Sequence, residues 1–279
     1  MKKDTTIDML MVEIKMRLTN FIFNKKPKIK FFSIIPEVAE VAPIVSAIKF
    51  KPNILKNSSE HLSQLKKSKS FGTKSIKHVA KCPGIFKYVQ YGWVMVAYQD
   101  IYIKTNGDGT SFEWKTPMNQ KELTNGKPVG DYLSFLSKEE YSTFTNGIHD
   151  SLNTLIKIQS PWRCIIPKGY YLHEGPMPYT DERRFTPVSG VFDRDDGVAQ
   201  LNPFLQWHLL NGETVIKAGT PIAHYMLIPK EQAQLEVGEA TKKELFAESV
   251  TQLAIFRRYV SKRSDNQCIF KKMFKNFES

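Results

Sequence analysis

Carboxylates and imidazoles, the side chains that bind metal ions or transfer protons, recur through the second half of the chain. If this half closes into a barrel, residues near the ends of different strands could converge at one mouth and supply two or three ligands for iron, manganese or zinc. The local His-x-Asp or His-x-His pair of cupin-type and oxygenase sites is missing. The candidate ligands are His173, Glu174, Asp193, Asp195, Asp196, His208 and His224.

A simpler interpretation of the same residues involves no chemistry, and we prefer it. The run from Asp193 to Asp196 is typical of a solvated turn, and His208 would be a strand residue with a satisfied hydrogen bond. Cys164 lies among Trp162 and isoleucines, which fits a buried, inert thiol better than a nucleophilic thiolate. No cofactor is strongly implied.

Short strands and frequent turns dominate the middle of the chain and predict its fold class. A mainly β fold, a distorted barrel or sandwich with a helix at each end, accounts for the pattern better than alternating β and α units. Tight turns are expected at Asn106–Gly109 and at Asn211-Gly212. We expect strands at 29–35, 94–103, 112–114, 163–166, 169–173, 190–192, 204–210, 213–216 and 222–228.

The sequence divides into four parts. Residues 1–28 form an amphipathic helix that charged residues interrupt, so it is no transmembrane span. Residues 29–88 form a basic, partly irregular segment in which Pro36 breaks regular structure and 57–75 form an exposed loop. A β-rich body follows at 89–239. The basic part at 240–279 contains a helix over 241–263, which a capping box of Thr241 and Glu244 begins.

The net charge of +12 is concentrated at the two ends, whereas the body is mildly acidic. Basic ends could attract nucleic acid, an anionic membrane or an acidic protein partner. Lysines outnumber arginines strongly, and phosphate recognition more often uses arginine, so we favour solvated lysines over a nucleic-acid surface. The candidate contacts are Lys66, Lys67, Lys69, Lys74, Lys77, Arg257, Arg258, Lys271 and Lys272.

Two stretches, AKCPGIFKYVQYGWVMVAYQDIYI and SPWRCIIPKGYY with the later FTPVSGVFDRDDG, LNPFLQ and KAGTPIAHYMLIPK, resemble an uncharacterised family of proteins encoded by tailed phages, particularly marine ones. The resemblance covers about two-thirds of the chain, from the Pro36 region to Pro229. The family often has a Thr-Asp-Tyr-like sequence where this chain has Arg194-Asp195-Asp196. Membership implies a viral source, in the cytoplasm of an infected bacterial host or in the virion, and no particular activity.

The order of segments from Cys164 to Ile228 is similar to the barrel of trimeric dUTPases and dCTP deaminases. That family has an Ile-Pro-x-Gly-Tyr strand, a Gly-Val-Ile-Asp-x-Asp-Tyr turn and a Gly-Asp-x-Ile-Ala-Gln strand. This chain has Ile166–Tyr170, Gly190–Asp195 and Gly219–His224 at the matching places. The resemblance implies a β-clip fold, and it gives Asp193 the position of the aspartate that orients the attacking water.

Several parts of that enzyme family's site differ in this chain. The phosphate-binding motif would fall at Gly175–Thr180, the base-stacking tyrosine is replaced around Asp196, and a basic helix replaces the glycine-rich arm. A nucleotide hydrolase needs its phosphates and magnesium positioned. We therefore expect a non-catalytic binding or assembly protein, with a viral or host protein or further copies of itself as partner. A metal- or nucleotide-dependent enzyme using Asp193 and a nucleic-acid-associated protein are the alternatives.

Overall fold

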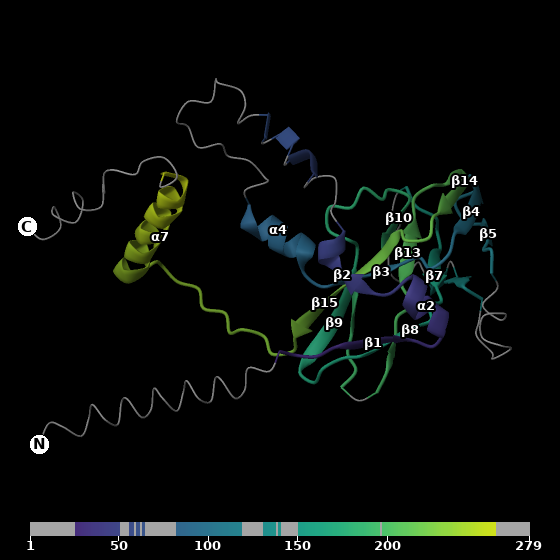
Figure 1. The fold of residues 1–279 in the computed structure, drawn as a ribbon, viewed down its shortest axis with the longest axis horizontal. Coiled ribbons are helices and arrows are strands. Elements are labelled where there is room, and N and C mark those ends of the chain that lie inside the picture. The colour runs from purple at the N-terminus through teal and green to yellow at the C-terminus, as the bar shows by residue number, and fades with distance from the viewer. Residues whose placement is uncertain are drawn as a thin grey trace, which may run out of the picture. The chain divides into compact units, whose positions relative to one another are not determined.

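The computed structural model describes residues 26–50, 56–58, 60–61, 63–64, 82–118, 131–137, 139–140, 150–195 and 197–260, without the side chains of Pro36 and of 252–260 (Figure 1). The chain divides into two compact units, residues 1–62 with 79–231 and residues 63–78 with 232–279. The helix predicted at the N-terminus lies outside the described residues. No helix in the described part is long and apolar enough to cross a membrane.

The first unit is mainly β, as the sequence predicts, and its strands form four antiparallel sheets (Figure 1). The first has the order β1 (Lys30–Ser33), β8 (Trp162–Ile165), β12 (Ala199–Gln200), and the second β10 (Phe185–Pro187), β13 (Phe204–Trp207), β7 (Leu155–Ile158), β6 (Leu133–Phe135). The third has the order β11 (Gly190–Phe192), β9 (Tyr170–Gly175), β15 (Pro221–Pro229), β3 (Trp93–Val96), β2 (Val45–Ser46), and the fourth β14 (Asn211–Ile216), β4 (Ile101–Asn106), β5 (Phe112–Lys115).

Short helices accompany these sheets, namely α2 (Pro36–Val41), the 3-10 helix η1 (Ala47–Lys49) and α4 (Pro83–Gln90). Strand β4 buries alternate residues, which is the pattern of a strand with one face on the core. Strand β15 lies between β9 and β3 and buries four successive residues, Ile222 to Tyr225. One contiguous hydrophobic core collects side chains from all four sheets, with Trp207 and Tyr225 among its largest fully buried members.

The turn predicted at Asn106–Gly109 is confirmed, and it joins β4 to β5. The carboxylate of Asp108 accepts hydrogen bonds from the hydroxyl of Ser111 and from the backbone N–H groups of Thr110 and Ser111. These bonds hold the pKa of Asp108 well below its usual range, with the Ser111 hydroxyl as the largest cause. The aspartate therefore organises the turn itself.

Two predicted connections are wrong because the chain changes sheets there. The single strand expected at 94–103 is interrupted at Ala97, whose backbone pairs with Gly219 and Thr220, so β3 and β4 enter different sheets. Asn211-Gly212 is not a turn between two paired strands. It begins β14, which pairs with β4, whereas the preceding β13 belongs to the second sheet.

Three further differences lie before residue 160. Pro36 does not end regular structure; it occupies the first turn of α2, where its missing N–H costs no helical hydrogen bond. Within the loop expected at 57–75, the described residues 57–58, 60–61 and 63–64 are helical. Strands β6 and β7, at 133–135 and 155–158, are absent from the expected strands, because three or four residues carry little periodic signal.

The second unit contains the helix α7 (Lys242–Val260), close to the predicted bounds of 241–263. The predicted capping box is confirmed. The backbone N–H of Thr241 donates to the Glu244 carboxylate at 2.7 Å, and the Glu244 N–H donates to the Thr241 hydroxyl at 3.3 Å. The ionised Glu244 carboxylate accepts hydrogen bonds from the backbone N–H and the hydroxyl of Thr241, which lowers the pKa of Glu244.

Candidate functional site

The acidic turn that contains Asp193 is held by one lysine. The ammonium of Lys230, which follows β15, contacts the carboxylates of Asp193 and Asp195, the latter at 2.7 Å. These two hydrogen bonds raise the pKa of Lys230 to about 12. More than half of each aspartate side chain is exposed, so the preferred interpretation of a solvated turn fits these contacts. Asp196 lies outside the described residues.

Glu174 and the two nearby histidines belong to the paired strands β9 and β15. The carboxylate of Glu174 is buried and accepts a 2.6 Å hydrogen bond from the Tyr225 hydroxyl, and burial raises its pKa to about 7. Nε2 of His224 lies 2.6 Å from the backbone oxygen of Tyr91, and burial lowers the pKa of this imidazole. Burial also lowers the pKa of His173, whose Nδ1 has no hydrogen-bond partner in the part of the chain that the structure describes.

The strand register separates these groups from the acidic turn. His224 on β15 pairs with Gly175, the last residue of β9. Pro229 pairs with Tyr170, the first residue of β9, and Lys230 comes directly after Pro229. Five residues of strand correspond to roughly 16 Å. The expectation that Asp193 and His224 meet at one mouth therefore finds no support in the register.

His208 lies in another part of the fold, beyond the end of β13. Its Nε2 is 2.9 Å from the hydroxyl of Thr186 and its Nδ1 is 3.3 Å from the backbone oxygen of Asp150. Both ring nitrogens thus have protein partners, as the simpler interpretation expected. Among the described side chains, no three His, Cys, Asp or Glu gather as a metal ion would require.

Cys164 is fully buried in β8, as predicted. Burial raises the pKa of its thiol to about 12, so the nucleophilic thiolate is strongly disfavoured at neutral pH. Of the basic residues proposed to contact nucleic acid, Arg257 and Arg258 lie on α7 without described side chains. The lysines among them, from Lys66 to Lys77 and at 271–272, fall outside the described residues.

The first unit has a surface pocket of about 650 Å³, a size typical of sites for small organic molecules. Three parts of the chain line it: the end of η1, the segment that connects β9 to β10, and the start of β15. Its lining residues are Lys49, Phe50, Met177, Thr180, Asp181, Glu182, Arg183, Arg184, Thr220 and Pro221.

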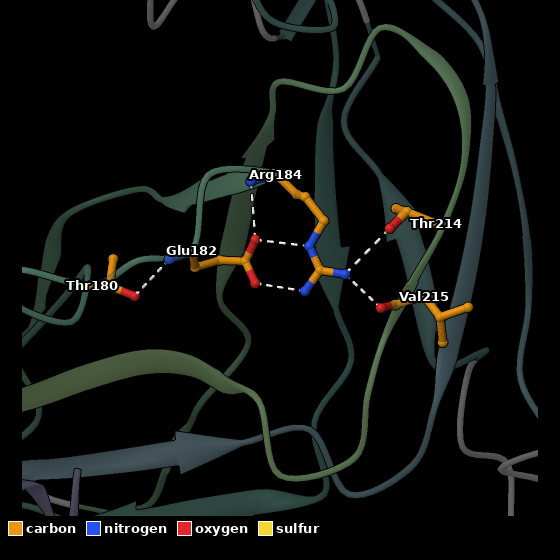
Figure 2. A network of polar contacts seen from close by, with 5 residues as sticks. All are labelled: Thr180, Glu182, Arg184, Thr214 and Val215. Atoms are coloured by element: carbon orange, nitrogen blue, oxygen red, sulfur yellow. Dashed lines mark hydrogen bonds and ion pairs between the residues drawn. The ribbon is translucent and has the colours of Figure 1, made fainter. Parts of the chain in front are cut away.

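Two of the lining residues, Arg184 and Glu182, form a bidentate ion pair (Figure 2). Two nitrogens of the guanidinium donate to the two carboxylate oxygens of Glu182, at 2.8 and 2.6 Å. The third nitrogen donates to the hydroxyl of Thr214 and to the backbone oxygen of Val215, both on β14. The backbone N–H of Glu182 donates to the Thr180 hydroxyl at 3.1 Å. The Glu182–Arg184 ion pair, here called the Glu182–Arg184 fork, therefore fixes the segment between β9 and β10 to the edge strand β14.

Replacement of Arg184 by alanine should lower the free energy of unfolding by about 2 kcal/mol, because the largely buried carboxylate of Glu182 and the carbonyl of Val215 both lose their donor. Chemical denaturation measures this difference. The control is Lys104→Ala, which breaks the exposed pair with Glu213 on the same β14 and should cost no more than about 0.5 kcal/mol. Equal losses in the two variants would contradict this role of Arg184.

This pocket was not predicted from the sequence. A partial signal was present, because Glu182 and Arg184 are two residues apart and side chains at that spacing lie on the same side of an extended chain. Lys49 and Phe50 carried no such signal, since they precede the rest of the lining by more than a hundred residues.

Helix α7 presents a second candidate surface. Leu245, Phe246 and Val250 are 54, 68 and 47% exposed. An exposed group of large apolar side chains on one helix is typical of surfaces that bind other proteins. We call these three residues the α7 apolar surface.

Comparison with models of known protein families gives no match to this chain, and comparison with curated proteins gives none either.

Proposed function

We propose that this chain is a non-catalytic binding and assembly protein of the kind that tailed phages encode, acting in an infected bacterial cell or in the virion. Its candidate reactive groups have structural partners, which supports this proposal over an enzyme: Asp193 contacts Lys230, Glu174 contacts Tyr225, and His208 lies between Thr186 and Asp150. A nucleotide hydrolase that uses Asp193 would first have to release that carboxylate from its lysine.

A distorted barrel or sandwich of the dUTPase-like type is the finer architecture that accompanies the proposal. The three segments that carry the resemblance, at 166–170, 190–195 and 219–224, contribute to β9, β11 and β15, which are neighbours in one sheet. In this proposal the shared scaffold serves binding, since a fold by itself does not determine an activity.

The α7 apolar surface is the observation that carries the proposal, and a second copy of the chain is its first partner. The helix has Lys242, Lys243, Glu244 and Glu248 near its start and Arg257 and Arg258 near its end. Two copies of α7 in antiparallel orientation would place Glu244 and Glu248 of one copy near Arg257 and Arg258 of the other, which is a favourable pairing. Burial of Phe246 and Val250 in such a pair would supply the free energy of association.

Size-exclusion chromatography with light scattering tests this assembly on the full chain. We expect an oligomer of fixed stoichiometry. Phe246→Ser with Val250→Ser should raise its dissociation constant by about 100-fold, because each of these side chains contributes about 1.5 kcal/mol or more on burial. Lys242→Ser with Lys243→Ser changes two exposed polar residues at the start of the same helix that form none of these pairs, and should leave the oligomer intact. A monomer at all concentrations, or equal effects of the two double variants, would refute the proposal.

A further inference from the structure

We infer that the pocket between η1 and the segment from Met177 to Arg184 binds an organic anion, a carboxylate or a phosphate ester on an apolar or aromatic body. This site lies wholly in the first unit and is independent of assembly through α7. Its lining combines cations, hydroxyls and apolar side chains, which is the composition that orients a small amphipathic ligand.

The sign of the ligand's charge follows from which lining charges already have partners. Both carboxylate oxygens of Glu182 accept bonds from Arg184, so this pair is internally neutral. Lys49 and Arg183 are exposed and form no ion pair with any described residue. Asp181 is the one further carboxylate of the lining. A ligand anion can therefore gain two cationic partners, whereas a ligand cation would meet a single carboxylate beside two like charges.

The apolar part of the lining indicates what carries the anion. Phe50, Met177 and Pro221 come from three separate parts of the chain and border the same pocket. An aromatic ring and a thioether provide adaptable contact with a flat or aliphatic ligand body. Inorganic phosphate would leave these contacts unused, so an organic anion fits the lining better.

The backbone beside the pocket shows strain where the ligand would bind. Tyr179 has a φ of +55°, a left-handed conformation that is uncommon for residues other than glycine, asparagine and aspartate. The turn from Met177 to Thr180 is closed by a hydrogen bond from the Thr180 N–H to the Met177 oxygen. Strain of this kind persists where the surrounding structure enforces it, and it is concentrated at ligand-binding segments. The Glu182–Arg184 ion pair just after this turn fixes the same segment to β14.

Titration calorimetry of the full chain with phenyl phosphate, benzoate, inorganic phosphate and benzylamine tests the inference. We expect one site for phenyl phosphate or benzoate, and the relative affinities of these two ligands identify the anionic group preferred. Lys49→Ala with Arg183→Ala should weaken binding by about 100-fold, since each charge-assisted hydrogen bond contributes roughly a factor of ten. Lys168→Ala with Arg194→Ala removes one exposed lysine and one exposed arginine elsewhere on the same unit, and should change affinity by less than about twofold.

Several results would overturn the inference. Equal weakening by the two double variants would mean that the anion is attracted only by the net positive charge of the chain. Binding of inorganic phosphate as tight as that of phenyl phosphate would remove the role of Phe50 and Met177. Preferential binding of benzylamine, or no binding of either organic anion, would also refute it. None of these outcomes depends on the oligomeric state that α7 determines.

Discussion

Replacement of Gly92 by alanine is expected to destabilise the protein by at least about 3 kcal/mol. Gly92 has a φ of +87° and lies where α4 meets β3. A Cβ at this position would lie 2.1 Å from the backbone oxygen of Tyr225, which belongs to the central strand β15 and cannot move without disturbing its pairs with β9 and β3. Both the left-handed backbone conformation and the steric clash with Tyr225 therefore destabilise the folded state of the alanine variant.

Gly219→Ala separates these two causes. Gly219 has a φ of +84°, almost the same as Gly92, but an added Cβ would meet no atom within 4 Å. We expect a loss of about 1 kcal/mol, the cost of the backbone conformation alone. Urea denaturation of both variants, with unchanged m-values, measures the two losses. Similar losses at the two positions would show that the approach of Tyr225 is unimportant.

Glu174→Gln is expected to make the free energy of unfolding much less dependent on pH between about 4.5 and 7. In the folded protein, burial raises the pKa of Glu174 to about 7 from the ordinary 4.5. The folded state therefore holds this proton more tightly than the unfolded state. The resulting stabilisation is fully present below pH 4.5, declines as pH rises to about 7, and amounts to about 3 kcal/mol in total. Glutamine carries no proton to lose and can still accept the hydrogen bond of Tyr225.

The measurement is a series of denaturation curves from pH 4 to 8 for the wild type, Glu174→Gln and the control Glu231→Gln. Glu231 is exposed just after β15, so its replacement removes the same charge without changing a buried site. We expect the free-energy difference between Glu174→Gln and the wild type to grow in favour of the variant as pH rises. A constant difference across this range would rule out Glu174 as the titrating group.

Local signals predicted much of the fold, and non-local pairing explains the rest. The hairpin turn at Asp108 and the capping box at Thr241 depend on residues close in sequence, and both are confirmed. The change of sheet at Ala97 depends on hydrogen bonds to residues 219 and 220, more than a hundred positions away. Which strand pairs with which is set by such contacts, and a single sequence does not encode them in its periodicity.

The candidate site shows the same division. Glu174 and Asp193 are both carboxylates in strand-rich surroundings. A solvated turn was expected at Asp193, whereas no sequence signal indicated that Glu174 is buried. The difference comes from Tyr225, whose hydroxyl reaches Glu174 across 51 residues, and from Lys230, which reaches Asp193 across 37. The pocket likewise needs Lys49 and Arg183, which lie more than a hundred residues apart in the sequence. His208 has the hydrogen-bond partners that the simpler interpretation expected, although it lies just beyond β13 and not within a strand.

The bond from Arg184 to the carbonyl of Val215 has a consequence for how copies of the chain meet. Among the described residues, strand β14 pairs only with β4, so a foreign strand could pair with its other edge and extend the sheet. The guanidinium of Arg184 donates to the Val215 carbonyl, which an incoming strand could otherwise use as an acceptor, and the ion pair with Glu182 holds the guanidinium in place. Loss of Arg184 would then leave this carbonyl open to intermolecular β pairing.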